Sequence, residues 1–168
     1  MDEAIDAYKR ALKLKPDYAE VHYNMGLVLN EKGKLDEAVA AFNEAILYKS
    51  DYAEAYNNMG NTLKEQDKLD EALSAYESAL ALKPNYAEAQ YNMGNALKEQ
   101  GKLDDALSTY ERAIALKPDY AEAHFNMGNI LQEQEKSQEA VKAYNKAISL
   151  KTDYAEAVYG MGLSLIHI

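Results

Sequence analysis

Glycine recurs every 34 residues along this chain, and that period constrains the fold more than any other feature of the sequence. The column contains Gly26, Gly60, Gly94, Gly128 and Gly162. Two segments one period apart, residues 53–86 and 87–120, are identical at about 25 of 34 positions. A fixed period of roughly 20–50 residues is typical of repeat proteins, in which equivalent units stack on their neighbours. The chain is therefore predicted to be an array of equivalent units.

Each unit is predicted to contain two amphipathic helices joined by a short turn. In the first helix, Ala55, Met59 and Leu63 are spaced by four residues and share one helical face. In the second helix, Ala72 and Tyr76 have the same spacing. A hairpin of this size cannot bury both apolar faces alone, so neighbouring hairpins must stack to complete the core.

Glycine and proline mark the predicted helix ends. Gly33 and Gly101 lie in the turn between two helices, where a left-handed residue commonly ends a helix. Asp67 and Glu135 occupy this place in other units and fit it less well. The second helix is expected to stop before Pro84 and Pro118, or before Ser50 and Thr152, which replace proline.

The first helix of each unit is expected to begin with a capping box. In that motif an Asp or Asn side chain accepts a backbone N–H, and a Glu three residues later reaches back. The pairs are Asp51 with Glu54, Asn85 with Glu88, and Asp119 with Glu122.

The glycine column is expected to permit close contact between helices. An interior helical glycine costs about 1 kcal/mol relative to alanine, so its repetition requires a packing reason. The alanine column of the second helix is the expected partner, because small side chains also permit close approach. It contains Ala4, Ala38, Ala72, Ala106 and Ala140.

These columns resemble the tetratricopeptide repeat. One unit carries the pattern as Tyr56, Met59, Gly60, Leu63, Ala72, Tyr76 and Pro84, and the next as Gln90, Met93, Gly94, Leu97, Ala106, Tyr110 and Pro118. The family's frequent tryptophan is replaced by His22, Tyr56, Gln90, His124 and Val158. The resemblance implies an all-α, right-handed superhelical solenoid of antiparallel helix hairpins. It also implies a concave groove, lined by the first helices, that binds extended peptides or helices.

In this frame residues 1–168 form a single array. It has a half repeat at 1–18, full repeats at 19–52, 53–86, 87–120 and 121–154, and a partial repeat at 155–168. The frame is interrupted at both ends, so the chain is expected to be a fragment, and exposed apolar ends predict self-association. Residues 163–168 fit the repeat in part and also resemble the translation of a transposon end used in sequencing libraries. No function is therefore expected of His167.

Two asparagine columns form the strongest candidate binding site. They contain Asn24, Asn58, Asn92 and Asn126, and, one turn later, Asn61, Asn95 and Asn129. Asparagine is a mediocre helix former, and its amide offers both donors and an acceptor. The columns are therefore predicted to bind the backbone of an extended peptide, and they resemble the asparagine ladder in the repeat arm of O-linked N-acetylglucosamine transferases. The alternative is that these amides bind neighbouring repeats.

Aromatic residues beside the first asparagine column are candidate side-chain pockets for the same peptide. They are Tyr23, Tyr91, Phe125 and Tyr159, and Asn57 interrupts the stripe. Aromatic residues at helical spacing also pack in cores, and this alternative stays open.

Charge and composition narrow the partner. The formal net charge of −10 disfavours nucleic acid and anionic membranes. Acidic columns border the expected groove, which favours a neutral or basic peptide over an acidic one. No apolar run approaches the roughly 20 residues that span a bilayer, and the N-terminus lacks a secretory signal, which predicts a cytoplasmic protein.

No catalytic, metal or cofactor site is expected. The chain has no cysteine, and His22 and His124 lie three repeats apart, too distant to share a metal. Gly33-Lys34 is followed by Leu35, where a phosphate-binding loop requires a hydroxyl. The leading hypothesis is a protein-interaction scaffold. The second is the substrate-recruiting arm of a larger glycosyltransferase or sulfotransferase whose catalytic domain lies outside this sequence.

Overall fold

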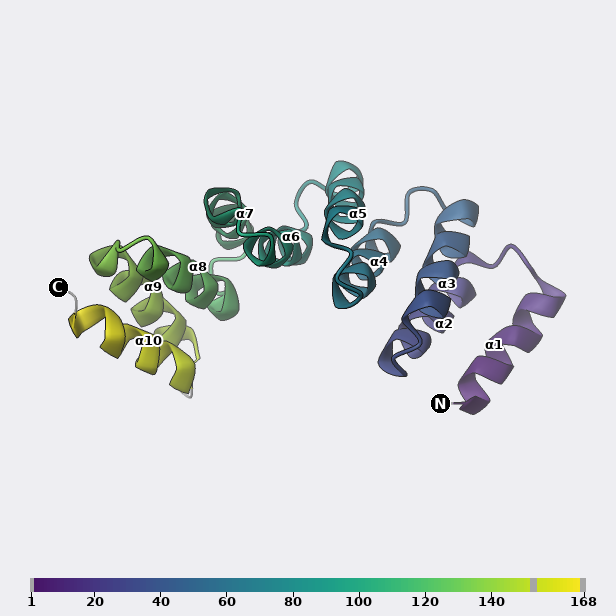
Figure 1. Cartoon of the computed structure of the whole chain (residues 1–168). Coiled ribbons are helices and arrows are strands. Elements are labelled where there is room, and N and C mark those ends of the chain that lie inside the picture. Colours follow the sequence, from purple (N-terminus) through teal and green to yellow (C-terminus); the bar gives the residue numbers. More distant parts are fainter. Residues whose placement is uncertain (1, 152–153, 167–168) are drawn as a thin grey trace. The chain divides into compact units, whose positions relative to one another are not determined.

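The computed structural model describes residues 2–151 and 154–166, and within those ranges it contains ten α-helices and no β-strand. The helices are α1 (Asp2–Leu14), α2 (Ala19–Glu31), α3 (Leu35–Tyr48), α4 (Ala53–Glu65), α5 (Leu69–Leu82), α6 (Ala87–Glu99), α7 (Leu103–Leu116), α8 (Ala121–Glu133), α9 (Ser137–Leu150) and α10 (Ala155–Ile166) (Figure 1). The predicted all-α class and the two helices per period are confirmed. Thr152, predicted to follow a helix end, and His167 lie outside the described residues.

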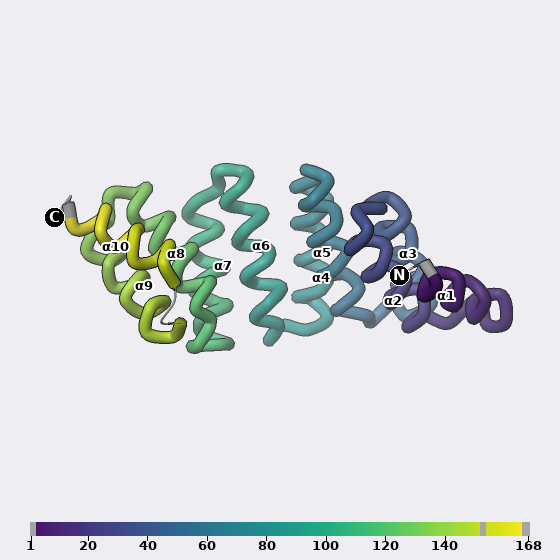
Figure 2. Tube along the Cα trace, turned by 90° about the horizontal axis from the view of Figure 1, so that it is seen from below, coloured from purple at the N-terminus to yellow at the C-terminus, as the bar shows by residue number. Residues whose placement is uncertain are grey.

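The chain divides into two compact units, Met1–Asn85 and Tyr86–Ile168. In the first unit, α2 pairs with α3 and α4 with α5, while α1 contacts α2 and α3 contacts α4. In the second unit, α6 pairs with α7 and α8 with α9, α7 contacts α8, and α10 lies against α9 and α8. Figure 2 shows the paired helices of each hairpin side by side. Each unit therefore has the nearest-neighbour stacking expected of a repeat protein.

Aromatic rings lie nearest to the side-chain position of the glycine column, and the expected contact with the alanine column stays a prediction. A Cβ atom built on Gly60 would lie 2.6 Å from Cε1 of Tyr76, and one on Gly94 would lie 2.7 Å from Cε1 of Tyr110. A Cβ atom on Gly26 would approach the ring of Phe42 in the same way, and one on Gly128 would approach the ring of Tyr144. All four rings are fully buried. The glycine removes a side chain so that a large ring lies flat on the backbone of the facing helix.

The turns inside the hairpins adopt the left-handed conformation predicted for them. Gly33 and Gly101 have φ values of 70° and 74°, and Asp67 and Glu135 have 61° and 59°. A non-glycine residue in this region is costly because its Cβ approaches the following carbonyl oxygen. Two of the four turns therefore carry local strain that glycine avoids in the other two.

Replacing Asp67 with glycine is expected to raise the free energy of unfolding by up to about 1 kcal/mol. Glycine relieves the left-handed strain, and its greater freedom in the unfolded chain offsets part of the gain. Chemical denaturation followed by circular dichroism measures the change. Gly101→Asp, at the equivalent turn, is the matched control and should lower stability by a similar amount. A less stable Asp67→Gly variant would contradict this account of the turn.

The predicted capping boxes are wrong. The first helices start one residue later than expected, so that Tyr52, Tyr86 and Tyr120 are the N-cap residues, and none makes a side-chain cap hydrogen bond. Asp51 accepts the Ala53 N–H through its backbone carbonyl instead, at 3.0 Å. The Tyr52 ring packs on Tyr23 of the preceding hairpin, with ring centroids 4.9 Å apart. Ring packing therefore sets where α4 begins.

The prolines end the second helices as predicted. Helix α5 ends at Leu82, two residues before Pro84, and α7 ends at Leu116, two residues before Pro118. This matches the steric restriction that proline imposes on the residue before it.

Candidate functional site

The seven asparagines of the two predicted columns all lie on first helices of the hairpins. They belong to α2, α4, α6 and α8. Asn24 is exposed, and the other six are half-buried. None is fully buried, so the predicted positions border the surface in both units.

The second asparagine column binds the hydroxyl groups of the buried tyrosines. Tyr76 donates to Oδ1 of Asn61 at 2.8 Å, and Tyr110 donates to Oδ1 of Asn95 at 2.7 Å. Tyr144 donates to Oδ1 of Asn129 at 2.9 Å and also contacts Oε1 of Gln132 at 2.8 Å. Each bond joins the two helices of one hairpin. For this column the structure supports bonding within the array, and contact of these amides with a ligand stays a prediction.

The first complete hairpin explains why asparagine occurs there. Its buried ring is Phe42, which has no hydroxyl, and the position one period before Asn61 is Leu27. Where the ring carries a hydroxyl the facing residue is asparagine, and where it does not the facing residue is leucine. A buried hydroxyl without a partner costs about 1–3 kcal/mol, so this pairing follows from hydrogen-bond satisfaction. Sequence reasoning missed the pairing, although the joint change at positions 27 and 42 signals it.

The buried tyrosines act as neutral donors. Burial raises the pKa of Tyr144 to about 12. The pKa of Tyr110 is also raised, first by burial and then by the nearby Tyr91 and Glu99. These hydroxyls keep their protons at neutral pH, so the amide oxygens that accept from them are engaged throughout the physiological range.

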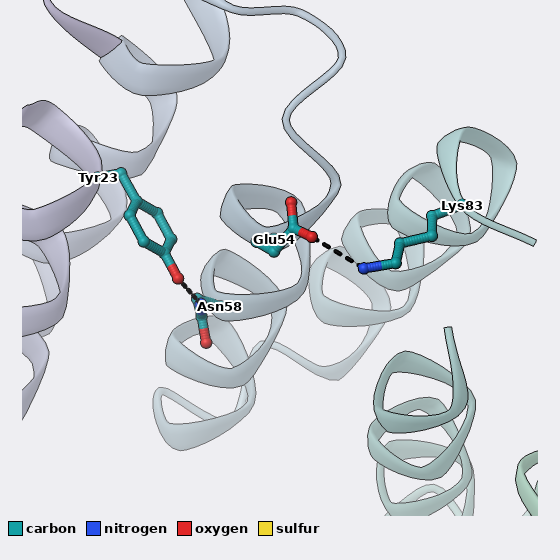
Figure 3. A network of polar contacts seen from close by, with 4 residues as sticks. All are labelled: Tyr23, Glu54, Asn58 and Lys83. Carbon is teal, nitrogen blue, oxygen red and sulfur yellow. Dashed lines mark hydrogen bonds and ion pairs between the residues drawn. The ribbon is translucent and has the colours of Figure 1, made fainter. Parts of the chain in front are cut away.

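Two asparagines of the first column, Asn58 and Asn126, are oriented by tyrosines of the preceding hairpin. Nδ2 of Asn58 donates to the Tyr23 hydroxyl at 2.8 Å (Figure 3). Nδ2 of Asn126 donates to the Tyr91 hydroxyl at 3.1 Å and to Oδ1 of Asn95 at 3.1 Å. These bonds hold each amide in one orientation. They also show that the Nδ2 group of each of these amides bonds to a neighbouring repeat, as the alternative interpretation expects.

The same amides keep capacity for a ligand. Within the described ranges no residue donates to Oδ1 of Asn58 or Asn126, and Asn24 makes no side-chain hydrogen bond. An amide carbonyl accepts two hydrogen bonds. Asn58 and Asn126 therefore offer an oriented acceptor beside the surface, and Asn24 offers the whole amide.

Three of the predicted aromatic residues pack between hairpins. Tyr23 contacts Phe42 and Tyr52, Tyr91 contacts Tyr110 and Tyr120, and Phe125 contacts Tyr144 and Tyr154, with ring centroids 4.7–5.9 Å apart. Such tilted arrangements are favourable for aromatic pairs. These rings support the hairpin junctions as well as the surface beside the asparagines.

A cavity in the second unit joins two of the predicted residue types. It has a volume of about 480 Å³ and lies between α8 and α10, lined by Phe125, Asn129, Gln132, Tyr159 and Leu163 among others. Tyr159 is 71% exposed. Aromatic, aliphatic and amide groups thus surround a space large enough for a side chain. Gln132 and Leu163 were not predicted as site residues.

The two histidines of the repeat pattern pack against the chain. His22 donates from Nε2 to the Pro16 carbonyl at 2.8 Å and stacks on Tyr48, and His124 has the same contact with Pro118 at 3.2 Å. Burial lowers the pKa of His124, which keeps the ring neutral. No group of three or more potential metal ligands occurs among residues 2–151 and 154–166.

Several acidic residues at the starts of first helices form ion pairs. Figure 3 shows Glu54 beside Lys83, whose Nζ lies 2.9 Å from Oε1. The hydrogen bond from Lys83 lowers the pKa of Glu54. Glu20 with Lys49 and Glu122 with Lys151 repeat the pair at 3.8 and 3.7 Å. Both partners are solvent-exposed, so each pair contributes little stability and can exchange for a ligand charge.

Comparisons with known proteins agree with this geometry. The family model described as TPR repeat matches residues 1–30, 26–67, 60–101 and 94–135, and the one described as tetratricopeptide repeat matches residues 121–154. This chain belongs to the tetratricopeptide repeat family. A search of curated proteins found no match. Family membership confirms the resemblance drawn from the repeat columns and supports a protein-interaction scaffold.

Solved tetratricopeptide structures share the fold. One crystal structure of MamA has 30% identity and a TM-score of 0.85, and the match covers 92% of this chain and 91% of that one. A second crystal structure of MamA has 30% identity and a TM-score of 0.81, with 92% and 85% covered. MamA residues 41 to the end, from Desulfovibrio magneticus RS-1, has 22% identity and a TM-score of 0.83, with 92% and 87% covered. This last likeness concerns the fold alone.

The helices give no sign of a membrane segment. No helix in the described part of the chain is both long and apolar enough to cross a bilayer.

Proposed function

We propose that this tetratricopeptide repeat protein is an interaction scaffold whose first helices bind an extended segment of a partner protein. The observation that carries the proposal is the pair Asn58 and Asn126 of the first asparagine column, whose amides are oriented by tyrosine hydroxyls and whose carbonyl oxygens accept no hydrogen bond from the described residues. An amide carbonyl oxygen held at the surface can accept a hydrogen bond from a backbone N–H of a bound peptide, whichever side chain that peptide residue carries. The column therefore suits recognition of peptide backbone rather than of one sequence.

Preorganisation favours such binding. An asparagine side chain that is already held in place loses less conformational freedom when a peptide binds. Each hydrogen bond contributes about 0.5–1.5 kcal/mol net, so a few amides barely offset the entropy lost on association. Affinity must then come from side-chain pockets as well. The cavity beside Phe125, Asn129 and Tyr159 is the proposed pocket for an apolar side chain of the bound segment.

The acidic surface favours a neutral or basic segment. The chain carries a net charge of −10, and Glu20, Glu54 and Glu122 lie at the starts of first helices. Their lysine partners are exposed and exchangeable. A basic side chain on the ligand can therefore replace an intramolecular lysine, whereas an acidic one meets like charge.

Removing two ladder amides is expected to weaken peptide binding about tenfold. Peptides are first selected from a displayed random library on the intact chain, and the affinity of the best binder is then measured by fluorescence anisotropy. Asn24→Ala with Asn58→Ala removes two proposed contacts, each worth about 0.5–1.5 kcal/mol. Helicity should change little. Asn24 has no internal side-chain bond in the described ranges, whereas Asn58→Ala also removes the bond to the Tyr23 hydroxyl and should lower the melting temperature slightly.

Two controls locate the effect. Asn43→Ala with Asn145→Ala makes the same chemical change at exposed positions of α3 and α9, and should leave affinity within twofold. Tyr23→Phe removes the bond that orients Asn58 but keeps the amide, and should weaken binding less than Asn58→Ala. If the ladder variant binds every selected peptide as tightly as the original chain does, the asparagine column is not the binding site.

A further inference from the structure

A second kind of pocket recurs in both units, away from the asparagine columns. In the first unit α1, α2 and α3 line a cavity of about 280 Å³ that is open to solvent, and its lining includes Ile5, His22 and Met25. In the second unit α7, α8 and α9 line an open cavity of about 350 Å³ with the equivalent Leu107, His124 and Met127. The two cavities are 102 residues apart in sequence, three periods, and neither lining contains an asparagine of the two columns.

A histidine side chain lines each of these two cavities. At the equivalent position of the hairpin α4–α5 the chain has Tyr56, a larger side chain. His22 and His124 are each only 8% exposed, and Nε2 of each ring donates to a proline carbonyl. Both Nδ1 atoms are buried and have no hydrogen-bond partner among the described residues.

The size of the first cavity suits one side chain. Small-molecule sites in proteins usually measure about 300–1,000 Å³, and this cavity lies just below that range. Ile5, Met25 and Leu29 supply apolar lining. The small side chains of Ala40 and Ala41 leave room for a ligand along α3. An aliphatic side chain from a partner removes this surface from water.

The rims of the two cavities differ in charge. The first has Glu37 and Glu44 on α3 with Lys9 on α1. Glu37 pairs with the exposed Lys34 at 2.8 Å, and Glu44 has no ion pair within residues 2–151 and 154–166. The second cavity has Lys142 and Lys146 where the first has Ala40 and Glu44, and it also has Glu139 and, in place of Lys9, Glu111. Acidic residues outnumber basic ones on the first rim but not on the second, so the first rim attracts a basic side chain more strongly.

We infer that the cavity at His22 docks a partner-protein segment that presents one aliphatic side chain beside a basic one. The aliphatic group enters between α1 and α3, and the basic group pairs with Glu44. The second cavity binds the same segment more weakly, because Lys146 stands in place of Glu44. The inference is independent of the asparagine column, so the two binding sites succeed or fail separately.

The test uses a dye-labelled, alanine-based helical peptide with one leucine and a lysine one turn before and after it. Binding to the intact chain is followed by anisotropy in physiological salt and by the ¹³C-methyl resonances of the six methionines. Saturable binding that shifts the Met25 resonance and leaves Met127 unchanged is expected. A peptide with serine in place of leucine should bind at least tenfold more weakly.

Exchanging the rim residues between the two cavities tests whether rim charge controls peptide binding. Ala40→Lys with Glu44→Lys gives the first rim the residues found at positions 142 and 146, so the fold should tolerate them, and binding should fall at least tenfold. Ser74→Lys with Glu77→Lys makes the same change of three charges on α5 and should leave binding within twofold. Lys142→Ala with Lys146→Glu should create a second site, seen as two peptides per chain and a shift of Met127.

Three results would overturn the inference. One is the absence of saturable binding by the leucine peptide, and another is equal binding by the serine peptide. The third is an equal loss in the α5 control, which would mean that overall charge rather than the cavity attracts the peptide.

Discussion

Gly94→Ala is expected to lower the free energy of unfolding by about 1–2 kcal/mol, although alanine is the better helix former. The added Cβ would lie 2.7 Å from both Cε1 of Tyr110 and Oγ1 of Thr109. Tyr110 is fully buried and hydrogen-bonded to Asn95, and Thr109 is buried and donates to the Ala106 carbonyl at 2.8 Å. Neither neighbour can yield easily, so overpacking of about 1–3 kcal/mol exceeds the propensity gain of about 1 kcal/mol.

The same substitution at Gly162 is the matched control and should have the opposite sign. Gly162 belongs to the same column and lies in a helix, but a Cβ there would have no neighbour within 4 Å. Only the propensity gain remains, so Gly162→Ala should raise stability by up to about 1 kcal/mol. Thermal and urea unfolding of both variants measure the difference. If the two substitutions shift stability in the same direction, contact with the aromatic ring is not the reason why glycine occurs at position 94.

Asn95→Leu is expected to cost about 1–3 kcal/mol, and Tyr110→Phe added to it should restore much of the loss. The single change leaves the Tyr110 hydroxyl, whose hydrogen-bond partner in the described ranges is Asn95, without an acceptor in the core. Removing the hydroxyl as well removes the unpaired group. The double variant reproduces Leu27 and Phe42, which already occur together in the first complete hairpin.

A double-mutant cycle measures this coupling. Urea unfolding of the original chain, both single variants and the double variant gives the interaction free energy between positions 95 and 110. The expected value is about 1 kcal/mol or more, in the sense that each change is tolerated better when the other is present. Leu107→Ala with Asn126→Ala is a comparison pair, because the hydrogen bonds of Asn126 in the described ranges go to Tyr91 and Asn95, and near-additive effects are expected. Additive effects at 95 and 110 would mean that asparagine occurs there for another reason.

The period of the sequence was sufficient to predict the helical hairpins, their turns and the family. It depends on residues whose roles are local: Gly33 and Gly101 in left-handed turns, and Pro84 and Pro118 beyond helix ends. The capping boxes were predicted incorrectly because tertiary packing of Tyr52 on Tyr23 outweighs the local preference of Asp51. A capping motif describes one helix, whereas the start of these helices is determined by the hairpin before them.

The candidate site was predictable in position but not in detail. Helical spacing places Asn58 and Asn61 on one face, yet it does not reveal that Asn61 accepts from the Tyr76 hydroxyl while Asn58 donates to Tyr23. Donor and acceptor partners come from the facing helix and from the neighbouring hairpin, which a single helix pattern does not contain. For the same reason the ring over the glycine column was not predicted, since spacing alone does not show which side chain of the facing helix lies nearest to each glycine.

The tyrosine–asparagine bond has a consequence for how such an array changes length. Asn95 and Tyr110 belong to one hairpin, so loss or duplication of a 34-residue segment that begins after Phe42 removes or copies donor and acceptor together. A change that is not a whole number of periods would separate a hydroxyl from its acceptor or shift the ring off its glycine. Insertions and deletions in the gene are therefore expected to persist when they add or remove whole periods, because each hairpin then keeps both members of its own hydrogen bond.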